Sequence, residues 1–235
     1  MKKYIPNLLT LLNLVSGFIA TIFASKGYIE QACFLIMAGM VFDFSDGFAA
    51  RLLKAYSDIG KDLDSLADVV TFGVAPGAII YFLLTGSGLQ VLPAIILSSA
   101  LPAASALRLA KFNNDMEQST SFKGMATPAS AFTVVSFVIA SGYTDCPIFD
   151  TLVSSAWFAG GLSVFLAVMM LINTRMFSLK FSHLKYRGNE ERYIFAGVSI
   201  VLILVLGLAA LPMIMLSYIL ISLLFVALRR TGTMA

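Results

Sequence analysis

The chain has 235 residues, of which 59% are hydrophobic and only 12% are charged, and its mean hydropathy is +0.89. Soluble domains carry about 25% charged residues, so this composition excludes an ordinary soluble domain and predicts one membrane domain over residues 1–235. The net charge of +3 is expected to face an anionic membrane surface or an anionic substrate, and nothing in it indicates nucleic acid.

Apolar stretches long enough to cross a bilayer follow one another along the chain. A transmembrane helix needs roughly 17 to 25 mostly apolar residues. Because backbone N–H and C=O groups must pair with each other inside lipid, continuous runs of this length predict helices. We expect eight of them, at residues 4–24, 29–51, 63–84, 90–109, 127–143, 151–172, 193–210 and 212–229. The sequence therefore predicts an all-α integral membrane protein, a bundle of about eight transmembrane helices.

The basic residues predict how this bundle lies in the membrane. If the N-terminus is cytoplasmic and eight helices alternate in direction, Lys26 is the only one of the 16 Lys and Arg residues on the outer side. Cytoplasmic loops of membrane proteins carry an excess of Lys and Arg. We therefore expect a multi-pass protein of the cytoplasmic membrane with both termini in the cytoplasm.

Acidic residues gather where the second and third predicted helices meet the cytoplasmic interface. Asp43, Asp46 and Gly47 lie at i, i+3 and i+4, on one face of the second helix. Asp64 and Asp68 lie one turn apart on the third helix. Two neighbouring helices can thus direct four carboxylates to one point.

Such a cluster needs positive charge beside it. A charged side chain at the centre of a membrane helix costs about 2.5–3.5 kcal/mol, and repulsion between like charges adds to that cost. Two divalent cations would neutralise four carboxylates, and oxygen ligands suit Mg²⁺ or Mn²⁺. Two ions about 3.5–4 Å apart form a clamp for in-line displacement at phosphorus. A glycine at position 47 would let a phosphate approach the helix, and Arg51 could bind that phosphate.

Other interpretations of the cluster stay open at this point. Intramembrane acids also form proton or ion relays and structural salt bridges. A secondary transporter would place its site near the membrane midplane, whereas these acids lie at the interface end of their helices. A membrane prenyltransferase also binds a diphosphate through aspartates and Mg²⁺, but its two acidic motifs lie in distant helices. The local clustering favours an enzyme that acts on a phosphate group.

The two acidic helices carry a known signature. The pattern Asp43-x-x-Asp46-Gly47-x-x-Ala50-Arg51, eight residues, then Gly60-x-x-x-Asp64-x-x-x-Asp68 resembles the signature of the CDP-alcohol phosphatidyltransferases. The resemblance covers about residues 4–130. Within that family, the bacterial and archaeal type of phosphatidylserine synthase is similar in four segments: IPNLLTLLNL (5–14), LDSLADVVTFGVAPG (63–77), RLAKFN (108–113) and FKGMATPAS (122–130).

The resemblance implies a fold, an activity and a homodimer. The family core has six helices, so the predicted bundle would be that core plus two. The implied reaction transfers the phosphatidyl group of CDP-diacylglycerol to the hydroxyl of L-serine and releases CMP, with two Mg²⁺ or Mn²⁺ ions. Glycerol phosphate, inositol phosphate and choline are alternative acceptors, because the same signature occurs in enzymes that use them.

The resemblance also implies roles for individual residues. Asp68 would be both a metal ligand and the general base. The other metal ligands would be Asp43, Asp46 and Asp64, and CDP-diacylglycerol would be bound by Asn7, Thr10, Gly47, Arg51 and Ser57. Asn7 and Thr10 could instead cap the end of the first helix.

A serine acceptor needs a cation for its carboxylate. Arg108 and Lys111 lie one turn apart at the cytoplasmic end of the fourth predicted helix, and Lys123 lies just before the fifth. These three are the candidate serine-binding residues. The alternative is that they only anchor helix ends in a cytoplasm-facing position.

Overall fold

The structure is a computed structural model that describes residues 4–55, 57–114, 124–174, 176–177 and 189–230. Across these residues the chain is helical and forms no strand. The elements are α1 (Tyr4–Ser25), α2 (Ile29–Leu53), α3 (Asp58–Asp68), the π-helix η1 (Val69–Val74), α4 (Ala75–Gly86), α5 (Val91–Asn114), α6 (Thr127–Tyr143), α7 (Pro147–Val153), α8 (Ala156–Leu171), α9 (Glu190–Leu206), the short 3₁₀ helix η3 (Gly207–Ala209) and α10 (Ala210–Arg230).

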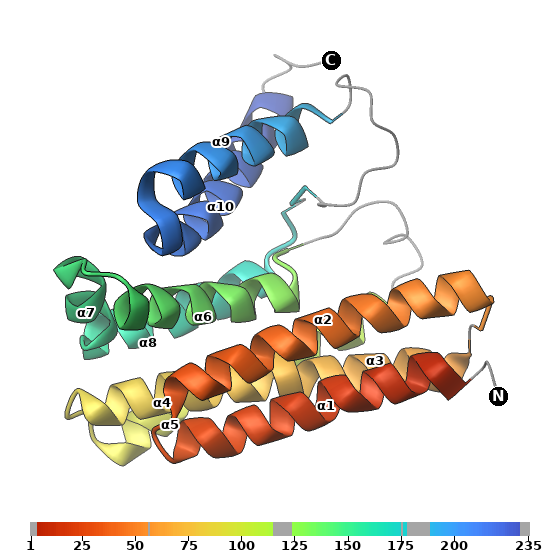
Figure 1. Ribbon diagram of the computed structural model, residues 1–235, viewed down its shortest axis with the longest axis horizontal. Helices are drawn as coiled ribbons and strands as arrows, with labels where there is room; N and C mark the ends of the chain where they lie inside the picture. Colours follow the sequence, from red (N-terminus) through yellow and green to blue (C-terminus); the bar gives the residue numbers. More distant parts are fainter. Residues whose placement is uncertain (1–3, 56, 115–123, 175, 178–188, 231–235) are drawn as a thin grey trace.

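The helices lie in three layers (Figure 1). The first layer holds α1, α2, α5 and the continuous helix from α3 through α4, the second holds α6 to α8, and the third is the hairpin of α9 and α10. The second layer packs on the first through α5 with α8 and α2 with α6, and α10 packs on α6. The buried core lies between the first two layers and extends to α10.

The described residues contain five helical stretches that are long and apolar enough to cross a membrane. They are α1, α2, Ile59–Gly86, α5 and Glu190–Leu228. A bent pair, α7 and α8, would make a sixth span, and α6 is apolar but has only 17 residues. An all-helical, multi-pass membrane protein is therefore confirmed, whereas the count of eight spans is not.

Two predicted spans differ from the observed helices for local reasons. Residues 151–172 do not form one helix, because the chain breaks between Val153 and Ala156 and turns by 75°. Ser155 caps the new helix by accepting a hydrogen bond from the Phe158 N–H. The turn between the last two predicted helices, expected at residue 211, begins instead at Gly207, which has φ +57°. Glycine adopts that backbone conformation readily, and there the chain turns back so that α10 runs beside α9 (Figure 1).

Small residues bring the helices of the first layer close together around Thr71. A Cβ atom on Gly17 of α1 or on Gly39 of α2 would overlap the Thr71 side chain of η1. The Thr71 hydroxyl donates a 2.8 Å hydrogen bond to the carbonyl oxygen of Asn13. Because η1 directly follows Asp68, this packing fixes the position of Asp68 relative to α1 and α2. π-Helical turns of this kind are frequent at functional sites.

Candidate active site

A cavity of about 630 Å³ lies toward the end of the bundle where α2 ends and α3 and α6 begin. Its walls come from α2, α3, α5, α6, α9, α10 and Phe177, so it is formed by all three layers. Most of its lining residues are apolar. The polar ones are Asp43, Lys61, Asp64, Ser65, Asp68, Arg108, Asn113, Thr127 and Tyr218.

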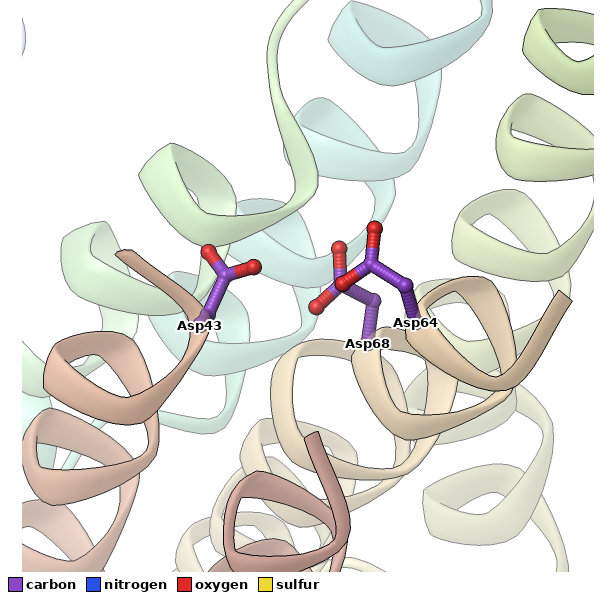
Figure 2. Close-up of side chains that lie close together, drawn as sticks. All are labelled: Asp43, Asp64 and Asp68. Carbon is purple, nitrogen blue, oxygen red and sulfur yellow. The ribbon is translucent and has the colours of Figure 1, made fainter. Parts of the chain in front are cut away.

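Three predicted metal ligands converge on this cavity. Asp43 comes from α2, and Asp64 and Asp68 come from successive turns of α3. Figure 2 shows their carboxylates pointing into the same space between the two helices. One carboxylate oxygen of each residue lies within 4.8 Å of the corresponding oxygens of the other two. Asp68 is buried, and the other two are half-buried.

Asp46, the fourth predicted ligand, lies outside this triad. It is one turn beyond Asp43 on α2 and is buried. Its Oδ2 is 2.6 Å from the Thr10 hydroxyl, which also lies 3.1 Å from the carbonyl oxygen of Pro6. In this structure Thr10, which the sequence analysis places in the nucleotide pocket, therefore orients Asp46.

Asn13 supports Asp68 from α1. Its side chain is fully buried, and its Nδ2 donates a 3.3 Å hydrogen bond to Oδ1 of Asp68. Sequence reasoning did not single out Asn13, although it lies inside the quoted segment IPNLLTLLNL. The signal in the sequence was an amide side chain in the middle of an apolar membrane helix. Such a side chain destabilises the helix in the membrane unless it has a hydrogen-bond partner.

Asn7 and Ser57 lie beside the same glycine. A Cβ atom added to Gly60 would be 2.9 Å from Ser57 Oγ and 3.2 Å from Asn7 Oδ1. Ser57 is the N-cap of α3, and its Oγ accepts a 3.0 Å hydrogen bond from the Gly60 N–H. The cap leaves the Ser57 hydroxyl proton available to a ligand. The structure thus brings two of the predicted nucleotide residues together where α1 meets α3.

Gly47 and Arg51 lie one turn apart on α2. A Cβ atom added to Gly47 would meet nothing within 4 Å, so packing within the described chain does not explain a glycine there. Arg51 is exposed in the last turn of α2. The open space over Gly47 is compatible with the close approach of a ligand that the sequence analysis predicts.

The three predicted serine-binding cations differ in position. Arg108 of α5 is buried, with 8% of its surface exposed, and it lines the cavity with the acid triad. Lys111 is exposed and does not line the cavity. Lys123 lies outside the described residues. A cation that sequence reasoning did not select, Lys61, lines the cavity and donates a 3.2 Å hydrogen bond to the Asn113 carbonyl.

The last two helices, which lie outside the family resemblance over residues 4–130, line the cavity. Phe177, Phe195 and Tyr218 pack edge to face, with ring centroids 5.0 to 5.8 Å apart. The Tyr218 hydroxyl donates a 3.2 Å hydrogen bond to the carbonyl oxygen of Phe177. All three residues line the cavity, so the C-terminal hairpin, together with Phe177, forms an apolar wall of the cavity that holds the acids and Arg108.

The acid triad fits a divalent metal ion. Carboxylate oxygens are the hard ligands that Mg²⁺ and Mn²⁺ prefer. With Mg–O distances of about 2.0–2.1 Å, opposite oxygens of one octahedral ion lie about 4.2 Å apart. The triad oxygens all lie within 4.8 Å of one another, so the three side chains are close enough to share an ion once they turn toward it. A bound cation would also offset the repulsion between carboxylates held this close.

The same region of the chain matches a known family. Residues 3–172, more than half of the chain, match the family model described as CDP-alcohol phosphatidyltransferase. The chain belongs to the CDP-alcohol phosphatidyltransferase family. This confirms the membership predicted from the two acidic motifs of α2 and α3. The CDP-alcohol phosphatidyltransferase match includes all the acids of the site and ends before the C-terminal hairpin.

Named proteins similar to this CDP-alcohol phosphatidyltransferase include two from bacteria and one from an archaeon. The chain is 40% identical over 135 residues to the CDP-diacylglycerol–serine O-phosphatidyltransferase of Bacillus subtilis, which is 57% of this chain and 74% of that protein. It is 34% identical over 212 residues to the protein of the same name from Helicobacter pylori, 89% of this chain and 85% of the relative. It is 33% identical over 146 residues to the archaetidylserine synthase of Methanothermobacter thermautotrophicus, 60% of each chain.

Proposed function

We propose that this protein transfers the phosphatidyl group of CDP-diacylglycerol to the hydroxyl of L-serine, giving phosphatidylserine and CMP. The observation that carries the proposal is one cavity that contains Asp43, Asp64 and Asp68 together with the buried Arg108. The names of the similar proteins from Bacillus subtilis and Helicobacter pylori support the same donor and acceptor.

The metal site of the proposal uses the four aspartates of α2 and α3. Asp43, Asp64 and Asp68 would hold two Mg²⁺ or Mn²⁺ ions, with Asp46 completing the ligand set from the next turn of α2. When bound, the ions supply positive charge that neutralises the diphosphate and the charge that develops at phosphorus. Thr10 would keep Asp46 oriented, because its hydroxyl already lies within hydrogen-bond distance of Oδ2.

The donor lipid would lie with its nucleotide against α1, α2 and the start of α3. Asn7 and Ser57 meet beside Gly60, and we propose that they contact the nucleotide together with Thr10. The backbone at Gly47 would allow a phosphate to approach α2, and Arg51 would pair with that phosphate. The acyl chains would remain in the lipid between helices.

In the proposed chemical step, Asp68 is the general base. Asp68 accepts the proton of the serine hydroxyl, and the serine oxygen forms a bond to the phosphorus that carries diacylglycerol. The bond from that phosphorus to the bridging oxygen breaks, and CMP leaves with the electron pair. Since Oδ1 of Asp68 accepts a hydrogen bond from Asn13, we assign the proton to Oδ2. Most of the rate acceleration would come from positioning and electrostatics.

Arg108 would bind the carboxylate of serine. Its burial in the cavity of the acids favours this role over a simple anchor at a helix end, which does not require burial. Lys111 is exposed and suits an anchor better. A role for Lys123 in serine binding stays a prediction.

The proposal includes a membrane arrangement. We propose a single domain of eight helical segments in the cytoplasmic membrane, with the cavity at the cytoplasmic face. In support, the cavity is lined by the parts of α2, α3, α5 and α6 that the charge pattern predicts to be cytoplasmic. A homodimer is proposed from the family resemblance alone.

The choice of acceptor decides the function, so the experiment compares acceptors. Purified protein in detergent would be supplied with CDP-diacylglycerol, Mg²⁺ or Mn²⁺, and one radiolabelled acceptor at a time: L-serine, glycerol 3-phosphate, inositol 1-phosphate or choline. We expect label in lipid, with equimolar CMP, only from serine. Efficient labelling by another acceptor, with none from serine, would contradict the proposal.

A further inference from the structure

Two buried donors on the cavity wall have no hydrogen-bond partner among the described residues. They are Nε of Arg108 and the hydroxyl of Thr127. Arg108 is 8% exposed and Thr127 is 0% exposed, and both line the cavity that holds the acid triad. A buried donor without a partner is destabilising, and native proteins rarely retain one without a reason. Two such donors that line one cavity, one from α5 and one from α6, point to a ligand that accepts hydrogen bonds.

The backbone beside Thr127 adds positive potential to the same cavity. Thr127 is the first residue of α6, a 17-residue helix whose N-cap residue, Ala126, gives no side-chain cap. Ala126, Pro128 and Ala129 line the cavity with Thr127. The N-terminus of a helix carries unsatisfied N–H groups and partial positive charge, and it attracts anions. The first turn of α6 and the guanidinium of Arg108 thus favour a negatively charged ligand.

The start of α6 is held in place by the end of α8 and by the residues that follow it. The N–H of Met125 donates a 2.8 Å hydrogen bond to the Met169 carbonyl, and that of Gly124 donates 2.9 Å to the Thr174 carbonyl. Gly124 has φ +75° and lies so close to Met170 that a Cβ atom would overlap the Met170 carbonyl. The chain therefore enters α6 along a fixed path, and this path sets the position of Thr127.

We infer that the first turn of α6, through Thr127, binds the carboxylate of the amino-acid acceptor together with Arg108, and that Thr127 is a specificity-determining residue. The inference rests on the proposed function, because the carboxylate distinguishes serine from a simple amino alcohol. The Thr127 hydroxyl donates to one carboxylate oxygen, and Arg108 supplies the opposite charge. The acids of α2 and α3 remain available for the serine hydroxyl in the same cavity.

The test replaces Thr127 by Val, which keeps the shape and removes the hydroxyl, and by Ser, which keeps the donor. The matched control is Thr133→Val on the same helix. Thr133 is equally buried, at 1% exposed, but its hydroxyl donates 2.8 Å to the Ala129 carbonyl, and it does not line the cavity. Serine KM and CDP-diacylglycerol KM would be measured for each variant, with size-exclusion profiles as a check on folding.

We expect Thr127→Val to raise the serine KM about ten- to a hundredfold, the range for one hydrogen bond to a charged group. Thr127→Ser should stay within about threefold of wild type, since the hydroxyl donor is kept. The KM for CDP-diacylglycerol should be unchanged in both, and Thr133→Val should match wild type. If Thr127→Val does not fold, Thr127→Ala removes the same hydroxyl and is held to the same expectation.

A serine analogue separates recognition from general damage. Serinol, 2-amino-1,3-propanediol, lacks the carboxylate, so its inhibition constant against serine should be the same in Thr127→Val and wild type. Three results would overturn the inference while the proposed function stands: an equal loss of affinity for serine and serinol, an unchanged serine KM, or a rise confined to the KM for CDP-diacylglycerol. The last of these would assign the anion site to the donor phosphate. A wild-type protein that makes no phosphatidylserine would overturn the proposed function itself, and the inference with it.

Discussion

The side-chain amide of Asn13 donates a 3.3 Å hydrogen bond to Oδ1 of Asp68, across a sequence separation of 55 residues. Asn13 itself is held, because its backbone carbonyl accepts a hydrogen bond from Thr71 in the π-helix that follows Asp68. The first helix therefore contacts both the side chain of the proposed general base and the π-helix that follows it. This contact makes Asn13 a positioning residue whose loss should be visible in catalysis.

We expect Asn13→Leu to lower kcat by about ten- to a hundredfold, the effect of losing one hydrogen bond to a charged group, with little change in either KM. Asp68→Asn, which cannot accept a proton at neutral pH, should still bind CDP-diacylglycerol and set the lower limit of kcat. The control is Asn114→Leu, since Asn114 is exposed and its amide donates to the Ala110 carbonyl of its own helix. A rise in KM with normal kcat in Asn13→Leu would show that Asn13 serves substrate binding instead.

Metal dependence follows from the acid triad. Excess chelator should abolish turnover, and added Mg²⁺ or Mn²⁺ should restore it. Asp43→Ala and Asp64→Ala should each be nearly inactive at saturating metal, because each removes one of three oxygens held within 4.8 Å of one another. Turnover would be followed by CMP release. Undiminished activity in excess chelator would exclude a metal-dependent mechanism.

Gly47 and Gly39, two turns apart on α2, should respond differently to alanine. A Cβ atom at Gly47 meets nothing within 4 Å, so Gly47→Ala should fold normally and raise the KM for CDP-diacylglycerol. A Cβ atom at Gly39 would overlap Thr71 and approach Asn13. Gly39→Ala should therefore lower the free energy of unfolding by about 1–3 kcal/mol, the usual cost of overpacking, and this loss would be seen as a lower thermal unfolding temperature. Wild-type kinetics in Gly47→Ala would contradict a role for Gly47 in the approach of the donor phosphate.

Arg108 and Lys111 form a second matched pair on α5. Arg108→Ala should raise the serine KM about ten- to a hundredfold, since a charge-assisted hydrogen bond contributes about 1.5–3 kcal/mol. Lys111→Ala should leave serine kinetics unchanged, because Lys111 is exposed and lies off the cavity wall. Steady-state assays at saturating CDP-diacylglycerol distinguish the two. An unaltered serine KM in Arg108→Ala would weaken the case for serine over a neutral acceptor.

The proposed orientation can be checked with single cysteines at exposed positions. Lys54 follows α2, and Gln90 precedes α5. With Cys33 and Cys146 replaced by Ala, Lys54→Cys and Gln90→Cys should react with an impermeant thiol reagent from opposite sides of sealed vesicles. Labelling of both from one side would contradict the alternating arrangement and the cytoplasmic placement of the cavity.

The sequence by itself determined the class, the family and most of the acid cluster. Its hydrophobic content required a membrane protein, because so few charges cannot cover a soluble surface. Asp64 and Asp68 could be placed together because a helix repeats every 3.6 residues, and Asp43 could be placed near them because a short connection joins its helix to theirs. These are local relationships, so they can be read along the chain.

Only the tertiary structure decided which distant residues meet that cluster. The pairing of Thr10 with Asp46, the support of Asp68 by Asn13, and the lining of the cavity by Phe177 and Tyr218 all join segments far apart in the chain. Such contacts depend on how closely helices approach one another and on their rotation about their axes, which glycines such as Gly17 set through packing. The break before α8 was missed for a related reason, because it interrupts an apolar run where hydropathy hardly changes but the backbone does. The turn between the last two helices was predicted, but at residue 211, and the backbone places it at Gly207.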